Sequence, residues 1–283
     1  MLSVEHVTKR YGNFTALDDI SLSFVPGVYG LLAPNGAGKT TLMKLLTTLL
    51  FPSGGQILWE GEDIFSLGEA YRGILGYLPQ EFGYYPNNTP VQFLRYGAAL
   101  QCMPKRQAEQ RIEELLELVG LTDVKNKKLR QFSGGMLQRV GIALSLIHEP
   151  RILILDEPTA GLDPRERVRF RNLIHSLSAD RVVILSTHIV SDVETIAGTI
   201  VMIRDHKIYA QDTPAHICAT LRGKVFETGD KSSLTAGQYP LSERQSEHGT
   251  VFRILCEDAP PVGTPSEPTL EDAFLSIYRE ERT

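Results

Sequence analysis

The sequence of 283 residues predicts an α/β fold, and three features of it support that prediction. First, residues 27–32 form an apolar stretch that leads into a glycine-rich loop, and residues 38–50 after the loop have the apolar spacing of a helix. Second, residues 152–155 and 182–185 are continuous apolar runs, which are typical of strands buried on both faces of a parallel sheet. Third, helical periodicity follows each run, and strands that alternate with helices indicate an α/β architecture.

The first half of the chain predicts strands on both sides of the glycine-rich loop and then a helical block. The predicted strands are residues 2–7, 20–24 and 55–60. From residue 89 to about residue 147 the sequence predicts helices only. Thr89 and Pro90 are typical of an N-cap followed by proline at the first helical position, and residues 105–119 place their apolar side chains at helical spacing.

The α/β pattern resumes after this block and ends before a tail of different composition. The predicted elements are a strand at 152–155, a helix at 164–177, a strand at 182–185, a helix at 189–197 and a hairpin of residues 200–203 and 207–210. After Asp212 prolines become frequent. The tail predicts short strands at 225–228 and 251–256, a linker at 258–268 and a helix at 269–282.

Composition narrows the function classes. The net charge of −5 disfavours a nucleic-acid partner, because proteins that coat nucleic acids are usually basic. The three cysteines form no CxxC pair and predict neither a disulfide framework nor a zinc cluster. No apolar run approaches the roughly 18 to 20 residues that span a bilayer, and the first residues do not have the pattern of a signal peptide. We therefore expect a soluble intracellular chain of about two domains.

The glycine-rich loop, Pro-Asn-Gly-Ala-Gly-Lys-Thr at residues 34–40, predicts a phosphate-binding site. Backbone N–H groups of such a loop form a concave nest at the positive end of a helix. We expect Lys39 to add a positive charge for the β- and γ-phosphates and Thr40 to offer its hydroxyl to Mg²⁺. The residues expected to contact ATP here are Asn35, Gly36, Ala37, Gly38, Lys39, Thr40 and Thr41.

The loop departs from the pattern GxxxxGK[ST] at one position, because Ala33 stands where the pattern has glycine. At a positive φ an alanine costs on the order of 1 kcal/mol, whereas at a negative φ it costs almost nothing. Because Ala33 ends a predicted strand, we expect a negative φ.

Two carboxylates, Asp156 and Glu157, come directly after the apolar run at 152–155. Ligands of α/β proteins collect at the carboxyl ends of strands. We expect Asp156 to hold Mg²⁺, directly or through water, and Glu157 to polarise a water in line with the γ-phosphate. Alone, such charges are often a solvated strand end, but together with the loop they predict nucleotide hydrolysis.

A third motif opens an apolar helix at residues 132–139, FSGGMLQR, and with it the chain resembles the ATP-binding subunits of ABC transporters. The motif is similar to that family's signature, usually written LSGGQ, with Phe132 for leucine and Met136 for glutamine. The resemblance implies that Ser133, Gly134 and Gly135 contact phosphate from a second helix N-terminus.

Four further residues match family motifs in the family's order. Tyr11 matches the aromatic residue that stacks on adenine, and Gln80 matches the glutamine that touches Mg²⁺ or the attacking water. Asp163 matches the loop that crosses to a partner subunit, and His188 matches the histidine that contacts the γ-phosphate. The resemblance thus implies catalytic roles for Glu157, His188 and Gln80, and Mg²⁺ ligation by Thr40, Gln80 and Asp156.

The resemblance also implies a domain organisation. We expect an ATPase domain at residues 1–212 with a P-loop NTPase (RecA-like) core, an N-terminal antiparallel β subdomain and an inserted helical subdomain at about residues 86–148. Residues 213–283 would be a small C-terminal accessory region. The run at residues 268–275 is similar to the tail of ATPases from drug and bacteriocin exporters, although a plain amphipathic helix explains it equally well.

The family's mechanism implies the cofactors ATP and Mg²⁺ and two kinds of partner. Two ATPase subunits, identical or different, would form a head-to-tail dimer with two composite sites, and a separate transmembrane permease would carry the substrate. The chain would then lie in the cytoplasm, on the cytoplasmic face of the membrane. Export is the first hypothesis. The alternatives are an ATPase of a peptide-antibiotic sensing or immunity complex and an ABC ATPase that acts on nucleic acid or ribosomes.

A cluster of aromatic residues at 81–86, just after Gln80, suggests where a permease would dock. If these side chains are exposed, they form a docking patch. The alternative is that they pack back onto the helical block.

Overall fold

The computed structural model describes residues 1–229, 238–246, 249–257 and 263–278. This part of the chain divides into two compact units, Met1–Gln211 and Asp212–Thr283. Each unit is described by itself below.

The first unit begins with an antiparallel sheet in the order β2-β1-β4-β5. Its strands are β1 (Leu2–Tyr11), β2 (Phe14–Phe24), β4 (Gly54–Trp59) and β5 (Glu62–Asp63). Apolar side chains that alternate with polar ones along β1 and β2 are buried, which is the pattern of a half-covered sheet. The predicted antiparallel β subdomain is confirmed, with longer strands than the alternation indicated.

The second sheet of this unit contains the parallel strands and has the order β10-β9-β3-β8-β7-β6. Its strands are β3 (Gly27–Leu32), β6 (Leu75–Leu78), β7 (Ile152–Asp156), β8 (Val182–Ser186), β9 (Thr199–Arg204) and β10 (Lys207–Asp212). Every residue of β7 and β8 is buried, which confirms that the two apolar runs are interior strands. The predicted hairpin is also confirmed, and Asp205 and His206 form its turn with positive φ angles of 50° and 65°.

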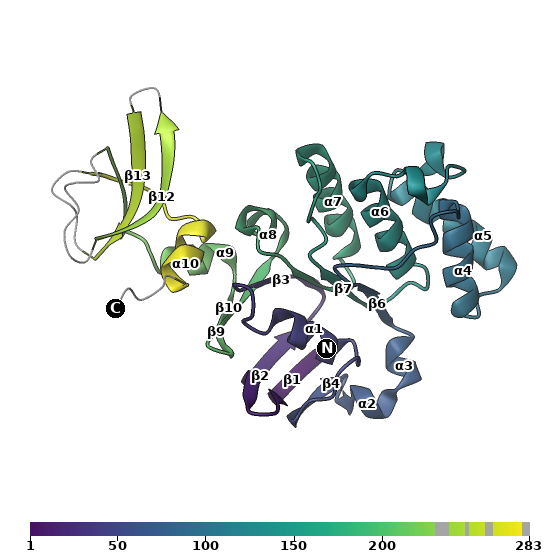
Figure 1. Cartoon of the computed structure of the whole chain (residues 1–283). Helices are drawn as coiled ribbons and strands as arrows, with labels where there is room; N and C mark the ends of the chain where they lie inside the picture. Colours follow the sequence, from purple (N-terminus) through teal and green to yellow (C-terminus); the bar gives the residue numbers. More distant parts are fainter. Residues whose placement is uncertain (230–237, 247–248, 258–262, 279–283) are drawn as a thin grey trace. The chain divides into compact units, whose positions relative to one another are not determined.

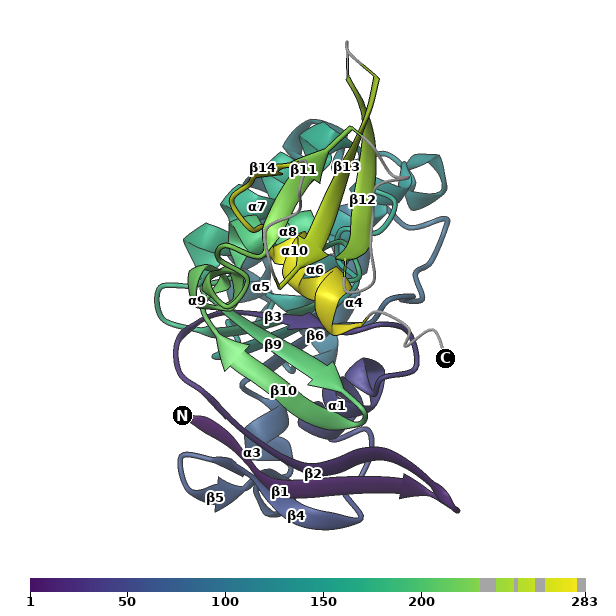
Figure 2. The ribbon, with the colours of Figure 1, turned by 90° about the vertical axis from the view of Figure 1, so that its left-hand side faces the viewer.

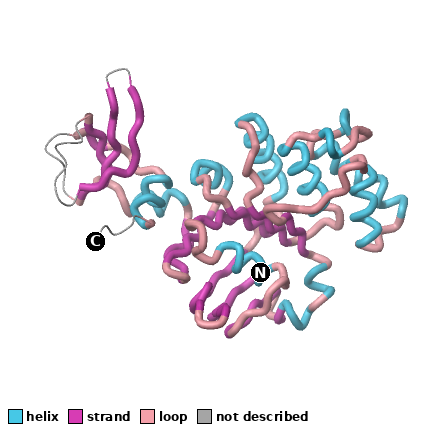
Figure 3. The backbone as a smooth tube through the Cα atoms, in the orientation of Figure 1, coloured by secondary structure: helices cyan, strands magenta, loops and turns pink. Residues whose placement is uncertain are grey.

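Helices cover both faces of this parallel sheet. Helices α7 (Pro164–Leu177) and α8 (Val190–Ile196) lie on one side, and α1 (Lys39–Leu46) lies on the other (Figures 1 and 3). Helix α1 contacts strands of both sheets and lies between them (Figure 2). Two short helices, α2 (Ile64–Leu67) and α3 (Glu69–Arg72), then lead to β6, a strand that the sequence did not predict.

Between β6 and β7 the chain is helical, as predicted. The block contains α4 (Pro90–Leu100), α5 (Lys105–Leu118), α6 (Gly134–Ser145) and the short 3₁₀ helices η1 (Thr122–Val124) and η2 (Leu129–Gln131). Thr89 caps α4 in a capping box with Gln92, and Pro90 takes the first helical position. Gly120 follows the end of α5 with a φ of 64°.

The described residues of the second unit form a small sheet in the order β12-β13-β11-β14 with two helices. Its elements are α9 (Pro214–Ala219), β11 (Val225–Thr228), β12 (Gln238–Ser246), β13 (Gly249–Cys256), β14 (Thr264–Pro265) and α10 (Leu270–Ile277). Arg253 joins sheet and helix, because its guanidinium binds Asp272 at 2.7 Å and Glu227 at 3.1 Å.

The tail predictions are partly confirmed. Strands β11 and β13 and helix α10 are where the sequence placed them, whereas β12 was not predicted. The linker prediction is wrong at Thr264–Pro265, because these residues pair with Glu227 and Phe226 of β11. Residues 258–262 of the linker and 279–282 of the terminal helix lie outside the described residues.

Candidate functional site

The glycine-rich loop joins β3 to α1 in the geometry that its sequence predicts. Ala33 is fully buried and is not among the residues with positive φ, so it takes this position without the strain that a left-handed conformation would impose. Gly38 precedes α1 with a φ of 108°, and a Cβ atom there would lie 2.6 Å from the carbonyl oxygen of Ala16. Glycine is therefore required at Gly38, whereas alanine is tolerated at Ala33.

Lys39 is the first residue of α1, and its side chain folds back over the loop. Only 8% of the residue is exposed, and its Nζ donates hydrogen bonds to the carbonyl oxygens of Ala33 and Pro34. Burial lowers the pKa of Lys39, and the nearby carboxylates of Glu157 and Asp156 partly oppose that shift. The lysine is thus a poorly solvated cation with both carboxylates close by.

The two carboxylates at the end of β7 have different partners. Asp156 is buried and accepts a hydrogen bond of 2.5 Å from the Ser186 hydroxyl. Glu157 has a φ of 51°, unusual for a residue with a side chain, and its backbone N–H donates to Ser186 Oγ at 3.1 Å. The Glu157 carboxylate lies 2.9 Å from Nδ1 of His188. One serine and one histidine therefore fix the acid pair.

Ser186 was not predicted as a site residue, although it stands two positions before His188. The sheet register brings Ser186 beside Asp156, because β7 and β8 pair in parallel with these two residues as Cα partners. Only this pairing of β7 with β8, which the sequence does not reveal, identifies Ser186 as a site residue.

These elements surround one hollow of about 290 Å³, which we call the loop hollow. Its lining residues are Tyr11, Phe14, Ala16, Asn35, Gly36, Gly38, Lys39, Thr40, Thr41, Gln80, Asp156, Glu157 and His188. All of these except Phe14 and Ala16 were candidate site residues. Ala37 belongs to the same loop, and its N–H donates to the Pro34 carbonyl at 3.4 Å.

Besides Ala37, four candidate residues do not line the loop hollow, and they form a second group. We call Ser133, Gly134, Gly135 and Asp163 the signature group. Ser133 caps α6 by accepting from the Met136 N–H, and Asp163 caps α7 by accepting from the Glu166 N–H. A Cβ atom on Gly135 would lie 3.1 Å from Leu162, so the start of α6 packs closely against the segment before Asp163.

An ion pair locks the two helices of the signature group together. Arg139 of α6 lies 3.0 Å from Glu166 of α7, and it also donates to the Val119 carbonyl at the end of α5. The signature group is thus one packed cluster, and it is separate from the loop hollow.

The loop hollow suits a hard divalent cation better than a zinc-type metal. Within the described residues no group of three or more His, Cys, Asp and Glu side chains is placed to hold a metal. Asp156, Thr40 and Gln80 instead offer one carboxylate, one hydroxyl and one amide oxygen around the same hollow. Mg²⁺ takes few protein ligands of this kind and completes its shell with phosphate oxygens and water.

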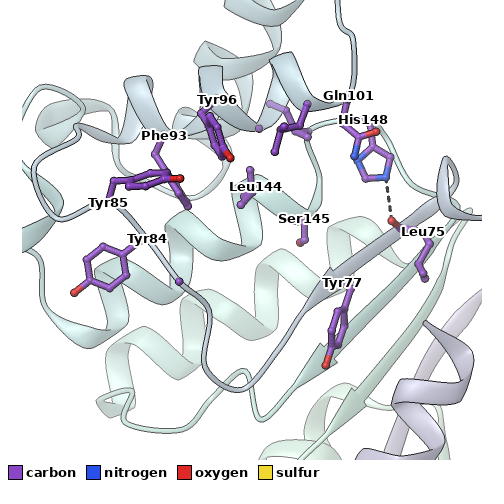
Figure 4. Close-up of a pocket in the computed structure, with 14 residues that line it drawn as sticks. Leu75, Tyr77, Tyr84, Tyr85, Phe93, Tyr96, Gln101, Leu144, Ser145 and His148 are labelled. Carbon is purple, nitrogen blue, oxygen red and sulfur yellow. Dashed lines mark hydrogen bonds between the residues drawn. The ribbon is translucent and has the colours of Figure 1, made fainter. Parts of the chain in front are cut away.

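A second hollow, of about 510 Å³, lies beside the helical block (Figure 4). The aromatic side chains that line it are Tyr77, Tyr84, Tyr85, Phe93 and Tyr96. We call it the aromatic groove. Tyr85 packs edge-to-face against Tyr96, with ring centroids 5.4 Å apart, and still exposes about half of its surface. Tyr85 therefore packs against α4 and also faces solvent, and docking at residues 81–86 stays a prediction. At the far end of the groove, His148 Nε2 lies 3.0 Å from the Leu75 carbonyl oxygen.

Nothing in the described part of the chain is a membrane-spanning helix, since none of its helices is both long and apolar enough.

Comparison with known proteins identifies the family. The family model described as ABC transporter matches residues 17–160, just over half of the chain. The daunorubicin resistance ATP-binding protein DrrA3 of Streptomyces coeruleorubidus is 34% identical over 99% of this chain and 96% of its own length. The bacitracin transport ATP-binding protein BcrA of Bacillus licheniformis is 37% identical over 98% of this chain and 97% of its own.

Among solved structures, cbiO1 of Clostridium perfringens, part of the ABC transporter complex cbiONQ, matches with a TM-score of 0.69 and 28% identity, covering 77% of this chain and 90% of its own. The predicted P-loop NTPase fold is thereby confirmed. The chain belongs to the ABC transporter family and is an ATP-binding, ATP-hydrolysing protein of that family.

Proposed function

We propose that the chain powers export through a separate membrane permease, with ATP joining two ATPase subunits head to tail. The observation that carries this proposal is the separation of the loop hollow from the signature group. Two helix N-termini suited to phosphate, those of α1 and α6, belong to these two different places. A nucleotide held in the loop hollow of one subunit can meet Ser133 and Gly135 only if a second subunit supplies them.

Different residues of the loop hollow bind the base and the phosphates of a nucleotide. Tyr11 stacks on the base, and the loop from Asn35 to Thr41 surrounds the phosphates with backbone N–H groups. Lys39 must leave its carbonyl partners to reach the β- and γ-phosphates. Since those hydrogen bonds hold a desolvated cation in the free protein, phosphate replaces them at little cost.

Asp156 and Glu157 have different roles in ATP hydrolysis. Asp156, with Thr40 and Gln80, would hold Mg²⁺, which when bound neutralises phosphate charge. Glu157 accepts a proton from the attacking water or orients it, because it lines the hollow and its carboxylate lies beside His188. His188 fixes the direction of that carboxylate until the γ-phosphate of ATP competes for the imidazole.

The dimer model is tested with Glu157→Gln, which keeps the size of the side chain and removes the base. This variant should accumulate as an ATP-bound dimer, visible as a doubled mass by light scattering at saturating ATP. A Glu157→Gln/Ser133→Arg double variant should bind ATP and stay monomeric, because Ser133 does not line the loop hollow. If Glu157→Gln alone remains monomeric while it binds ATP, the dimer model is wrong.

We propose the aromatic groove as the site where the permease docks. Its lining residues Gly83, Tyr84 and Tyr85 follow Gln80 closely along the chain, so a segment seated there would be connected to the loop hollow through residues 80–85. Docking there would hold the chain at the cytoplasmic face of the membrane. The relatives named for bacitracin transport and daunorubicin resistance favour export as the direction.

The docking proposal is tested by co-purification of the permease from membranes. Tyr84→Ala with Tyr85→Ala should abolish membrane association and leave the ATPase rate of the purified chain unchanged. Tyr209→Ala is the matched control, since Tyr209 is an equally exposed tyrosine on β10. Retention of the Tyr84/Tyr85 variant on membranes would refute the docking site. A captured membrane sensor in place of a permease would support the sensing or immunity alternative.

A further inference from the structure

A second exposed aromatic residue, Phe14, lies next to Tyr11 at the end of the loop hollow where the nucleotide base would bind. Tyr11 and Phe14 close the β1–β2 hairpin as directly paired Cα partners, with only Gly12 and Asn13 between them. Directly paired residues point to the same face of a sheet, with Cβ atoms about 5 Å apart. Both line the loop hollow, and they remain 45% and 53% exposed. Two large apolar rings thus stand side by side at the mouth of a polar hollow.

Phe14 is held in place by a residue 192 positions further along the chain. The ring of His206 meets the Phe14 ring edge-to-face, with centroids 5.3 Å apart and an interplanar angle of 89°. The histidine itself is fixed, because its Nδ1 lies 3.2 Å from the Ala16 carbonyl oxygen and its own carbonyl accepts from the Asp18 N–H. The β9–β10 turn therefore supports the strand that carries Phe14.

One face of Tyr11 already has a partner. The Lys9 ammonium lies over its ring at 5.3 Å from the centroid. A base that stacks on Tyr11 uses the remaining face, and its contact area is limited by the exposed part of one ring. Phe14 beside it would extend that apolar surface.

We propose that Phe14 is a second base-contacting residue of the ATP site and that His206 positions it. Aromatic rings recognise the π-face of a base and not its hydrogen-bonding edge, so the pair would favour purines in general and not adenine alone. The proposal rests on ATP binding by a single chain, and it is independent of dimerisation and export.

The test separates base contact from phosphate contact by using inorganic tripolyphosphate as a ligand that has no base. Replacing a stacking residue by alanine typically weakens binding by about fivefold or more. Because Phe14 is half exposed, we expect Phe14→Ala to weaken ATP and GTP binding by about fivefold each. Its affinity for tripolyphosphate should equal that of the wild type, and Phe14→Tyr should restore nucleotide binding. Unchanged ATP affinity, or an equal loss for tripolyphosphate, would overturn the proposal.

The role of His206 is tested with His206→Asn. Asparagine tolerates the positive φ of this turn position and removes the ring that touches Phe14. If His206 acts through Phe14, His206→Asn should weaken ATP binding by about twofold to threefold. The double variant with Phe14→Ala should then bind no more weakly than Phe14→Ala alone. Additive losses would show that His206 does not act by positioning Phe14.

Tyr209→Ala serves as the control on the same hairpin. Tyr209 is 54% exposed on β10 and does not line the loop hollow, so this variant should bind ATP like the wild type. A loss of ATP affinity in Tyr209→Ala as large as that in His206→Asn would show a general effect of the hairpin and would refute the positioning role.

Discussion

Ser186 is the residue through which the acid pair can be disturbed without touching a carboxylate. Its hydroxyl donates to Asp156 at 2.5 Å and accepts from the Glu157 N–H at 3.1 Å. Ser186→Ala removes both interactions and adds no atoms to a position that is fully buried. The Glu157 N–H keeps one partner, the Ser186 carbonyl at 3.1 Å, so the larger loss falls on Asp156.

The size of the effect follows from the charge on the acceptor. A hydrogen bond from a hydroxyl to a carboxylate stabilises a fold by about 1.5–3 kcal/mol, and a buried carboxylate oxygen that loses its donor keeps the cost of its desolvation. For a unit of this size we expect the melting temperature to fall by about 3–10 °C. Residues that orient a metal ligand typically change activity by about 10-fold to 100-fold, so we expect a loss of that size in kcat.

The assay is phosphate release at saturating ATP over a titration of Mg²⁺, with thermal unfolding measured on the same samples. The Ser186→Ala variant should need more Mg²⁺ to reach half its maximal rate. Thr47→Val is the matched control, because Thr47 has a buried hydroxyl that donates to the Met43 carbonyl away from the loop hollow. If Ser186→Ala loses stability but keeps the wild-type rate and Mg²⁺ requirement, Ser186 is only a structural residue and our reasoning is refuted.

Three further predictions concern other residues of the first unit. Tyr71→Phe leaves the Leu46 carbonyl without its buried donor at 2.8 Å, so the free energy of unfolding should fall by about 1 kcal/mol or more in denaturant titrations while ATPase activity persists. Gly38→Ala should abolish ATP binding because its Cβ meets backbone within 3 Å, whereas Gly36→Ala, with open space around it, should only weaken binding; equal losses in a binding titration would contradict this. Because burial lowers the pKa of Lys39 below 10.5, the unfolded chain holds the proton to higher pH than the folded chain, so the wild type should gain stability relative to Lys39→Met as pH rises towards 10.5; a parallel pH dependence of the two melting temperatures would refute it.

The sequence predicted the parts of the fold that local patterns determine. The apolar runs of β7 and β8 and the Thr89 cap each depend on residues within one element. Strands β6 and β12 were not predicted because their sequences have only weak strand patterns. Strand β6 is only four residues long and contains Gly76, whose Cβ would lie 2.3 Å from the Ser145 carbonyl oxygen, so its burial depends on a helix far along the chain. Strand β12 contains Pro240, which is unfavourable within strands, and it lies at the edge of its sheet.

In the candidate site, too, the sequence predicted the residues of local motifs and missed those that depend on distant parts of the chain. Residues in short motifs, such as Lys39 and Glu157, could be found from spacing and from resemblance to a family. Ser186 and Phe14 act through partners that only the folded chain brings together, one by strand register and the other by a hairpin turn. No pattern in the sequence marks a serine that joins the Asp156 carboxylate to the Glu157 backbone N–H, or a phenylalanine supported by a distant histidine.

The charges of the loop hollow lead to a last prediction, in which one substitution has opposite effects under two conditions. Among its lining residues Lys39 is the one lysine, and Asp156 and Glu157 are the two carboxylates. A triphosphate entering alone meets more negative than positive charge, so without a divalent cation Asp156 opposes binding. Asp156→Asn should therefore bind ATP more tightly than the wild type in a chelator such as EDTA, by about tenfold at most. With Mg²⁺ present the same variant should bind more weakly, because the cation loses a ligand. A titration calorimeter can measure both. If Asp156→Asn weakens ATP binding equally with and without Mg²⁺, Asp156 supports the loop and not the cation.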